Sequence, residues 1–384
     1  MNIAINLISF SSAKSVGTLV FTKRILCELF RNNPKYFSYV IYLQKGIPLD
    51  VFCIPASSNI KIVRVPKFKN SIHRIIFEQT LFYLYIKKCD IFFTPSLSLP
   101  IFSPGKKILT IHDMIPFWDR TKYSFFIRYY VILMTNLAAR VSDIIVTVSE
   151  SSKRDIIKYL NIKSEKIHVI YNFILKNEDV ITKRVVNETN LLVNDGISLR
   201  LDVPFFVTVS TLQPAKNIDG LIKAFILFKK KNPSYYLYIV GNKGWNYSGL
   251  FDLVKQNNME KYVFFSGYLD DVSLSTLYSY SKGIIYVSFY EGFGIPPLEG
   301  FYHGKSCVAS NVSSIPEVVG EAGYLVDPYD IKSIAGGMDL LVDDIEGRVR
   351  FIPEQLKKFI PENQIKKIIG LFNSLCPYSK TKPC

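Results

Sequence analysis

The sequence of 384 residues lacks several patterns that mark common protein classes. Only four histidines occur, none spaced like metal ligands on a helix, and no Asp-x-Asp triplet is present, so no tightly bound metal or other cofactor is predicted. No apolar run reaches the roughly 18 uncharged residues of a membrane helix. The nearest run, Tyr123–Ala139, contains Arg128. The first residues lack the basic segment of a signal peptide, so they are predicted to form a buried strand.

Cysteine is scarce and scattered, with no Cys-x-x-Cys pair and no short spacing typical of disulfide-rich domains. The six cysteines are Cys27, Cys53, Cys89, Cys307, Cys376 and Cys384. This pattern predicts free thiols in a reducing compartment.

Positive charge is confined to the first half of the chain. Residues 1–170 hold 24 Lys and Arg against 10 Asp and Glu, a net charge of +14, whereas residues 171–384 carry only +1. The asymmetry favours an anionic partner for the first half, either membrane headgroups, a phosphorylated lipid or nucleic acid. A solvated basic surface without a partner is the alternative. Nucleic acid is disfavoured because the sharpest motifs lie in the neutral half and no interleaved aromatic and basic motif occurs.

Short apolar runs alternate with amphipathic stretches in both halves, which predicts an α/β protein with two doubly wound, mostly parallel sheets. The expected strands are 3–9, 39–43, 60–65, 91–94, 108–111, 144–148 and 167–170, then 205–209, 237–240, 263–265, 284–287, 306–309 and 323–325. The predicted domains are residues 1–175 and 204–360, joined by a polar linker over 176–203, with a last helix at about 360–376 packing back on the first domain. Ligands bind beyond the carboxyl ends of parallel strands, so functional residues are expected in the strand-to-helix loops, facing a cleft between the domains.

The most specific loop reads EGFGIPPLE, from Glu291 to Glu299, between an expected strand and a helix that begins near Pro296. Gly292 and Gly294 allow a ligand to approach the backbone, and the free N–H groups of a helix start attract an anion. The carboxylate of Glu299 is suited to accept hydrogen bonds from a diol such as ribose. A tight turn with solvated glutamates is the alternative.

Three weaker loops follow other strands. STLQPAKN places Lys216 and Asn217 at a helix start, where the lysine charge suits a diphosphate. TIHD places His112 at a strand end, where it can hydrogen-bond a polar substrate. SVGT contributes the single glycine Gly17 after the first strand. A surface lysine, a structural histidine and a turn glycine are the respective alternatives.

Together these stretches resemble a family 4 glycosyltransferase of the two-domain GT-B fold, and the resemblance covers almost the whole chain. Its motifs are the loop at Gly17, TIHD (110–113), VTVSESSKRDI (146–156), STLQPAKN (210–217), YIVGNKGW (238–245), FSGYLDD (265–271), EGFGIPPLE (291–299) and ASNVSSIPEVVGEAGYLVDP (309–328). The variants TIHD, VGNKGW and LVDP are most similar to those of bacterial mannosyltransferases of surface-polysaccharide assembly.

The resemblance implies a retaining, metal-independent transfer of a sugar from a nucleotide-diphosphate donor on the second domain to an acceptor on the first. Carried over by motif, the catalytic residues are His112 at the donor sugar, Lys216 on the diphosphate and Glu291. The donor-binding residues are Gly17, Asn217, Gly241, Tyr268, Gly292, Phe293, Gly294, Ile295 and Glu299, the last at the ribose.

The sequence departs from the family pattern in two loops that are expected to bind phosphate. The family commonly reads GTLEPRKN where this chain has Ser210 and Ala215, so the arginine beside Lys216 is absent. The first loop commonly carries paired glycines and an arginine, of which only Gly17 remains.

By this resemblance the donor is GDP-mannose, with a UDP-hexose or GDP-fucose as the runner-up, and the acceptor is a glycan on a polyprenyl diphosphate. A catalytically impaired sugar-nucleotide-binding protein is a further alternative. The basic first half is then expected to approach an anionic membrane at the cytoplasmic face of the inner membrane. The expected contact residues are Arg120, Lys122 and the aromatic stretch 123–130, together with Lys61, Arg64, Lys67 and Lys69. A buried helix is the alternative for that stretch.

Overall fold

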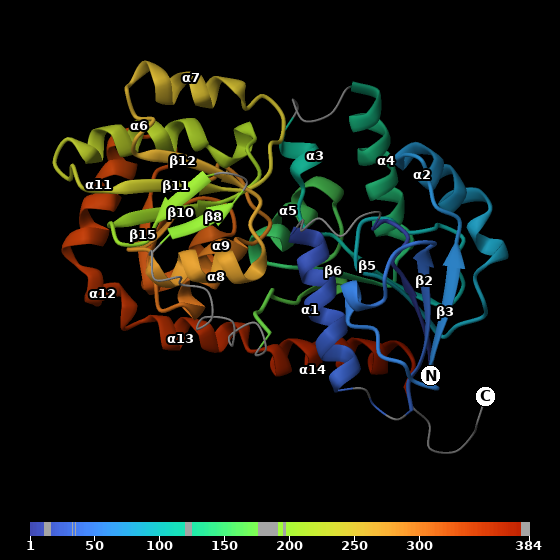
Figure 1. Ribbon diagram of the computed structural model, residues 1–384. Helices are drawn as coiled ribbons and strands as arrows, with labels where there is room; N and C mark the ends of the chain where they lie inside the picture. Colours follow the sequence, from blue (N-terminus) through green and yellow to red (C-terminus); the bar gives the residue numbers. More distant parts are fainter. Residues whose placement is uncertain are drawn as a thin grey trace. The chain divides into compact units, whose positions relative to one another are not determined.

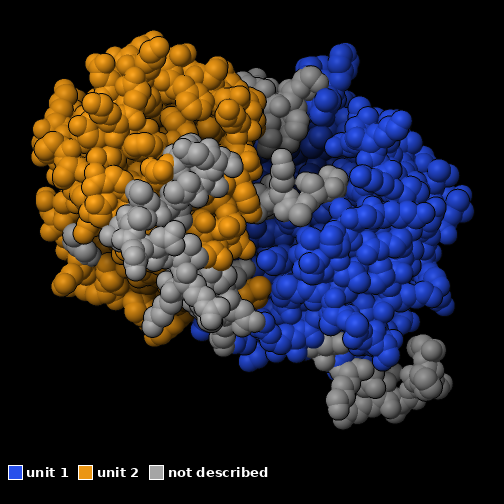
Figure 2. All heavy atoms as spheres, in the orientation of Figure 1, with its two compact units in different colours: residues 1–173, 360–384 blue, residues 174–359 orange. Residues whose placement is uncertain are grey.

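The computed structural model describes residues 1–10, 17–32, 34, 36–119, 125–175, 191–194 and 197–377. It divides into two compact units, residues 1–173 with 360–384 (unit 1) and residues 174–359 (unit 2) (Figures 1 and 2). Arg120 and Lys122, and most of the expected linker, lie outside the described residues. No helix in the described part of the chain is long and apolar enough to cross a membrane.

Unit 1 is built on a seven-stranded parallel sheet of order β3-β2-β1-β4-β5-β6-β7. Its strands are β1 (Asn2–Asn6), β2 (Ser38–Gln44), β3 (Ile60–Val65), β4 (Ile91–Thr94), β5 (Lys106–Thr110), β6 (Ile144–Thr147) and β7 (Ile167–Val169). Its helices are α1 (Gly17–Arg31), α2 (Ser71–Thr80), α3 (Ile115–Trp118), α4 (Phe125–Val141), α5 (Glu150–Leu160) and α14 (Pro361–Leu375), with 3-10 turns η1 (Asp50–Phe52), η2 (Phe82–Leu84) and η3 (Ser164–Lys166).

Side chains that alternate along the strands fill both faces of this sheet. Phe92 packs with Tyr42 and Phe82, whereas the next residue, Phe93, contacts Phe372 of α14 on the other face. Successive strand residues point to opposite faces, so a strand buried on both sides reads as a continuous apolar run.

Unit 2 repeats the plan with a six-stranded parallel sheet of order β12-β11-β10-β13-β14-β15. Its strands are β10 (Phe205–Val209), β11 (Tyr236–Val240), β12 (Val263–Gly267), β13 (Gly283–Tyr286), β14 (Cys307–Ser310) and β15 (Gly323–Val326). Its helices are α6 (Ile218–Lys229), α7 (Ser248–Gln256), α8 (Asp271–Tyr280), α9 (Ile295–Tyr302), α10 (Ile315–Val319), α11 (Ile331–Asp343), α12 (Ile345–Val349) and α13 (Ile352–Leu356), with η5 (Pro214–Lys216), η6 (Gly320–Ala322) and η7 (Lys357–Phe359).

Helices cover both faces of this second sheet as well (Figure 1). One core cluster joins Phe206 to α6, α7 and α11, and the other joins Phe205 to α8, α9, α10 and α13. The predicted pair of doubly wound parallel sheets is therefore confirmed.

The stretch before β10 differs from the expected linker. Strands β8 (Leu191–Asn194) and β9 (Ile197–Arg200) pair antiparallel, and Leu199 and Leu201 lie in a core cluster of unit 2. Residues 197–203 therefore belong to unit 2, because their apolar side chains pack on its sheet.

The prediction of free thiols is wrong for one pair. Cys27 of α1 and Cys53 after η1 form a disulfide with their Cα atoms 5.0 Å apart. The two cysteines lie 26 residues apart in sequence, and the packing of α1 against η1 brings them together. Cys89, Cys307 and Cys376 are free thiols, and Cys384 lies outside the described residues.

Candidate active site

The predicted residues of unit 2 lie at the carboxyl edge of its sheet. Strands β10 and β13 are neighbours although two strands, β11 and β12, separate them in the chain order, so the order reverses between them. In open parallel sheets, ligands bind outside the carboxyl ends of the strands at such a switch point. Lys216, in η5, follows β10, and Glu291 follows β13. The topology thus brings together two loops that stand 75 residues apart in the sequence.

Lys216 and Glu291 form an ion pair with Nζ of the lysine 2.5 Å from Oε1 of the glutamate. Both side chains are largely buried, with 14% and 10% of their surface exposed. The buried hydroxyl of Tyr286 donates a second hydrogen bond to the same oxygen, at 2.6 Å. Burial and the neighbouring carboxylate raise the pKa of Tyr286 well above its ordinary value, so the phenol remains a donor. Such a pair is stable when hydrogen bonds satisfy both charges.

Two serines after β14 hold the backbone of the Glu291 loop. The Ser313 hydroxyl lies 2.9 Å from both the N–H and the carbonyl oxygen of Glu291. The Ser314 hydroxyl donates to the carbonyls of Glu291 and Phe293, at 2.9 and 2.7 Å. These bonds fix the loop before a ligand arrives. The sequence analysis quotes both serines within SSIPE but assigns them no function.

Gly294 begins helix α9 in a conformation that favours glycine. Its φ is +114°, and a Cβ at this position would lie 2.8 Å from Cδ1 of Ile315. The N–H groups at the start of α9 that can face an anion belong to Gly294 and Ile295, because Pro296 and Pro297 carry none. Ile295 and Pro296 lie in the first turn, while the side chain of Phe293 is buried against Phe359.

Glu299 lies further along α9 and is half-buried. The Tyr278 hydroxyl of α8 donates to its Oε2 at 3.0 Å, which orients the carboxylate. Gly292, the remaining glycine of the loop, is half-buried between Glu291 and Phe293. Tyr278 of α8 therefore holds Glu299, and Tyr286 of β13 holds Glu291. The sequence analysis missed these two tyrosines because neither of them stands in a quoted motif.

Asn217 holds neighbouring loops together. Its side chain is buried, and its amide nitrogen donates to the carbonyls of Val287 and Pro328, at 3.1 and 2.7 Å. The residue itself has a φ of +54° and precedes the first turn of α6. Asn217 thereby ties the loop after β10 to those after β13 and β15, which positions Lys216.

Gly241 and Tyr268 lie at the same edge, after β11 and β12. Gly241 has a φ of +143°, and a Cβ there would lie 2.0 Å from the Ser210 carbonyl oxygen. Its N–H donates to the carbonyl of Gly267, the residue before the exposed ring of Tyr268. The structure therefore places Gly241 against the end of β10, whereas Tyr268 lies one strand further out, after β12.

In unit 1, His112 follows β5 and Gly17 begins α1. Nε2 of His112 is 3.0 Å from the Pro95 carbonyl oxygen, and its ring packs edge-on against Phe21 with centroids 5.0 Å apart. The Ser152 hydroxyl donates to the His112 carbonyl at 3.0 Å. Burial lowers the pKa of His112 below 6.5, so its imidazole is neutral at pH 7. Within the described residues, no group of three or more His, Cys, Asp or Glu side chains could hold a metal ion.

Two protein-family models match the chain. Residues 42–175 match Glycosyltransferase Family 4, and residues 195–358 match Glycosyl transferases group 1. A curated relative, the O-antigen chain mannosyltransferase B of Escherichia coli, is 33% identical over 236 residues, 60% of this chain and 61% of that protein. The O-antigen chain mannosyltransferase RfbU of Salmonella typhimurium is 30% identical over 227 residues, 59% of this chain and 58% of that protein. The chain thus matches about three fifths of the length of these relatives.

A solved structure shares the fold over almost the whole chain. Anabaena Alr3699/HepE, in complex with UDP and glucose, superposes with a TM-score of 0.73 and 18% identity, covering 97% of this chain and 100% of that one. At this identity the likeness shows the fold alone, which is the GT-B architecture. From the two family models and the GT-B fold together, the chain belongs to the glycosyltransferases.

Proposed function

We propose that the chain transfers mannose from GDP-mannose, with retention of configuration, to a glycan carried on a polyprenyl diphosphate during bacterial surface-polysaccharide synthesis. The observation that carries the proposal is the convergence of Lys216, Glu291 and the start of α9 at the switch point of unit 2. The names of the E. coli and Salmonella relatives support mannose as the sugar and an O-antigen glycan as the acceptor.

The proposed chemistry at this edge is electrostatic. The bond between the anomeric carbon and the diphosphate oxygen breaks with its electron pair on oxygen, so negative charge grows on the departing GDP. Lys216 and the N–H groups at the start of α9 oppose that charge, and the Glu291 pair with Tyr286 keeps the lysine in place. Because no metal takes part in this proposal, these groups supply the stabilisation.

Retention follows in this proposal from attack on the face that the leaving group vacates. The acceptor hydroxyl forms the new bond to the anomeric carbon, and its proton passes to the departing phosphate oxygen. His112, neutral at pH 7, hydrogen-bonds the donor sugar, and Glu299 accepts hydrogen bonds from the ribose.

Thermal-shift titration of the full chain with GDP, UDP, ADP and their sugar conjugates tests the donor, since a ligand that binds only the folded state raises the Tm with concentration. We expect GDP and GDP-mannose to give the largest shifts. A larger Tm shift with a UDP-hexose or with GDP-fucose would show that this compound, and not GDP-mannose, is the donor. The titrations with UDP compounds are essential because the HepE structure contains UDP. Donor binding with neither transfer to a supplied acceptor nor hydrolysis to free mannose would favour the catalytically impaired alternative.

We further propose that unit 1 contacts an anionic membrane at the cytoplasmic face of the inner membrane. Helix α4 is apolar along most of its length, yet only Thr135, Ala138 and Ala139 are buried. Phe126 and Tyr129 are 83% and 65% exposed, so the aromatic stretch is not the buried helix considered as an alternative. The net charge of +14 in residues 1–170 complements anionic headgroups.

Sedimentation with vesicles tests the membrane proposal. We expect the full chain to pellet with phosphatidylglycerol vesicles at low salt, to stay in solution with phosphatidylcholine vesicles, and to be released as salt screens the charges. A Phe126→Ser/Tyr129→Ser variant should bind less. Failure to bind phosphatidylglycerol vesicles at low salt would remove this part of the proposal.

A further inference from the structure

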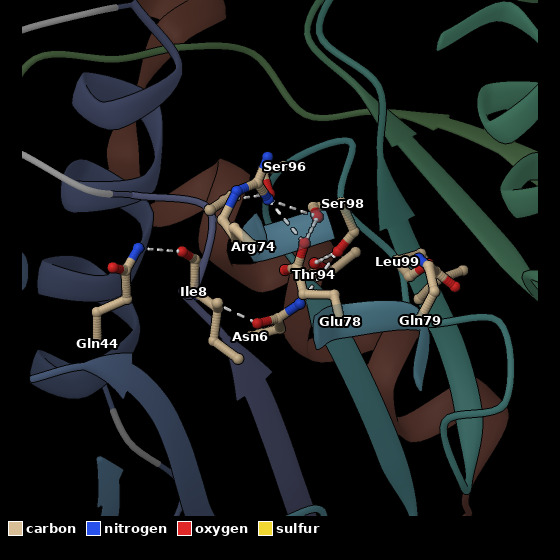
Figure 3. A network of polar contacts seen from close by, with 11 residues as sticks. Asn6, Ile8, Gln44, Arg74, Glu78, Gln79, Thr94, Ser96, Ser98 and Leu99 are labelled. Carbon is tan, nitrogen blue, oxygen red and sulfur yellow. Dashed lines mark hydrogen bonds and ion pairs between the residues drawn. The ribbon is translucent and has the colours of Figure 1, made fainter. Parts of the chain in front are cut away.

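A buried cluster of charged and polar side chains lies at the carboxyl edge of the unit 1 sheet (Figure 3). Nη1 of Arg74, on α2, donates to Oε2 of Glu78 at 2.7 Å and to the Ser98 hydroxyl at 2.9 Å. That hydroxyl in turn donates to Oε2 of Glu78 at 2.5 Å. The Glu78 side chain is 1% exposed, whereas that of Arg74 is 16% exposed. Glu78 is therefore the internal support, and Arg74 is the member that solvent reaches.

The cluster occupies the switch point of unit 1. Strands β1 and β4 are neighbours there, as β10 and β13 are in unit 2. Asn6, at the end of β1, and Thr94, at the end of β4, both donate to the Ser98 carbonyl oxygen at 3.0 Å. The ends of the two strands thus hold the short segment that carries Ser98.

The same segment connects the cluster to His112. The Pro95 carbonyl oxygen, at its start, accepts a hydrogen bond from Nε2 of His112, and the Ser98 hydroxyl, at its end, accepts one from Arg74. Four extended residues span at most about 14 Å. A substrate that reaches His112 with its reacting group can therefore place a second group near Arg74.

One edge of the Arg74 guanidinium, formed by Nε and Nη2, makes none of the hydrogen bonds described above. Both hydrogen bonds of Arg74 use Nη1, and within the described residues Nε and Nη2 have no hydrogen-bond partner. Nε and Nη2 form the planar fork that binds two oxygens of a phosphate at once. The local charge favours an anion, because residues 51–89 contain seven Lys and Arg and only one acidic residue, Glu78.

We propose that Arg74, held by Glu78 and Ser98, binds the diphosphate of an isoprenoid-linked acceptor. The inference rests on the proposed function, because it is that function which supplies such an acceptor. The chemistry recognised is a phosphate on an apolar chain, and the occupant is the isoprenoid diphosphate, in preference to a phospholipid headgroup.

Calorimetric titration of the full chain with farnesyl diphosphate tests the site, with farnesol as the uncharged probe. Arg74→Lys keeps a positive charge beside Glu78 but removes the fork, and we expect it to weaken farnesyl diphosphate binding about 10- to 100-fold. The double variant Arg74→Gln/Glu78→Gln, which leaves no unpaired buried charge, should lose the same binding. Farnesol should bind wild type and variants alike.

Two matched variants separate this site from its surroundings. Lys69→Gln removes an exposed positive charge five residues away and should change affinity less than twofold. Lys216→Ala removes the lysine that is proposed to bind the donor diphosphate in unit 2. It should also leave the affinity for farnesyl diphosphate unchanged. Binding that survives in both Arg74 variants, or is abolished only by Lys216→Ala, would overturn the proposal.

Sedimentation of the Arg74→Lys variant with vesicles distinguishes an isoprenoid diphosphate from a phospholipid headgroup as the occupant of the site. If Arg74→Lys reduces pelleting with phosphatidylglycerol vesicles while farnesyl diphosphate affinity is unchanged, the occupant is a headgroup and the proposal is wrong. Failure of GDP to stabilise wild type, with farnesyl diphosphate binding still dependent on Arg74, would remove the proposed function alone.

Discussion

The two units share one topology but use their switch points differently. In unit 2 the edge combines backbone at positive φ, at Gly294 and Gly241, with the buried side-chain pair of Lys216 and Glu291. In unit 1 the corresponding edge is built from side chains, with Arg74 supported by buried Glu78. Backbone N–H groups suit a diphosphate whose position is set by a helix start, whereas a single guanidinium can meet phosphates carried on varied molecules. Under the proposed function, the difference teaches that one fold can supply a rigid edge for the donor and an adaptable edge for the acceptor.

The largest expected effect is on the unit 2 side. Lys216→Ala removes the positive charge that we propose opposes the departing diphosphate, and losing one such contact costs about 2.7–4 kcal/mol, or roughly 100- to 1000-fold in kcat. Steady-state transfer assays with saturating donor measure it. Lys223→Ala, which removes an exposed lysine on α6 paired with Asp219, is the control and should retain activity. Turnover within threefold of wild type in Lys216→Ala would reject the role of this lysine.

The backbone character of the unit 2 edge is tested by Gly294→Ala. The added Cβ would meet Ile315 while φ is held at +114°, so we expect a loss of about 1–3 kcal/mol in the free energy of unfolding, together with a loss of donor binding. Gly304→Ala is the matched control, because its φ is also positive, at +67°, but nothing lies within 4 Å of the added Cβ. Urea unfolding curves compare the two, and equal losses would show that strain alone, without the clash, accounts for the effect.

The alternation of apolar runs predicts much of this fold, because a strand buried on both faces leaves a local signature. The pattern predicts all thirteen strands of the two parallel sheets, and the structure confirms two doubly wound domains. It also places Lys216 and Glu291 in loops at one edge. The β8–β9 pair was missed because its polar, poorly periodic sequence is typical of a linker.

Side-chain partnerships between distant segments could not be predicted. Lys216 and Glu291 are 75 residues apart, and nothing local in either motif shows that the charges neutralise each other. Arg74 and Glu78 have the ordinary spacing of a helix-surface pair, so only the structure reveals that the Glu78 side chain is buried beside Arg74. The disulfide between Cys27 and Cys53 depends in the same way on how α1 packs.

The Tyr286→Phe substitution tests whether the hydrogen bond from Tyr286 positions the Glu291 carboxylate. The substitution removes the hydrogen bond to Oε1 but leaves Lys216 in place, and a hydrogen bond to a charged group contributes about 1.5–3 kcal/mol. If Tyr286 positions the carboxylate, the KM for the donor should rise about tenfold or more, with a smaller fall in kcat. Tyr324→Phe is the control, since it removes a hydrogen bond to Asp344 of equal 2.6 Å length on another element. A donor KM that rises equally in both variants would reduce Tyr286 to a purely structural role.

The smallest expected effect is the pH response of His112 on the unit 1 side. Burial lowers its pKa in the folded state below the ordinary 6.5, so the unfolded chain binds the proton more readily. The contribution of His112 to stability is therefore complete above pH 6.5 and is lost as pH falls below it, with a slope of at most about 1.4 kcal/mol per pH unit. His112→Asn should flatten the fall in unfolding free energy between pH 7 and 5, whereas His73→Asn, which changes an exposed side chain, should not. An unchanged slope in His112→Asn would mean that the imidazole is protonated as easily in the fold as in the unfolded chain, and the neutral donor-sugar contact would lose its basis.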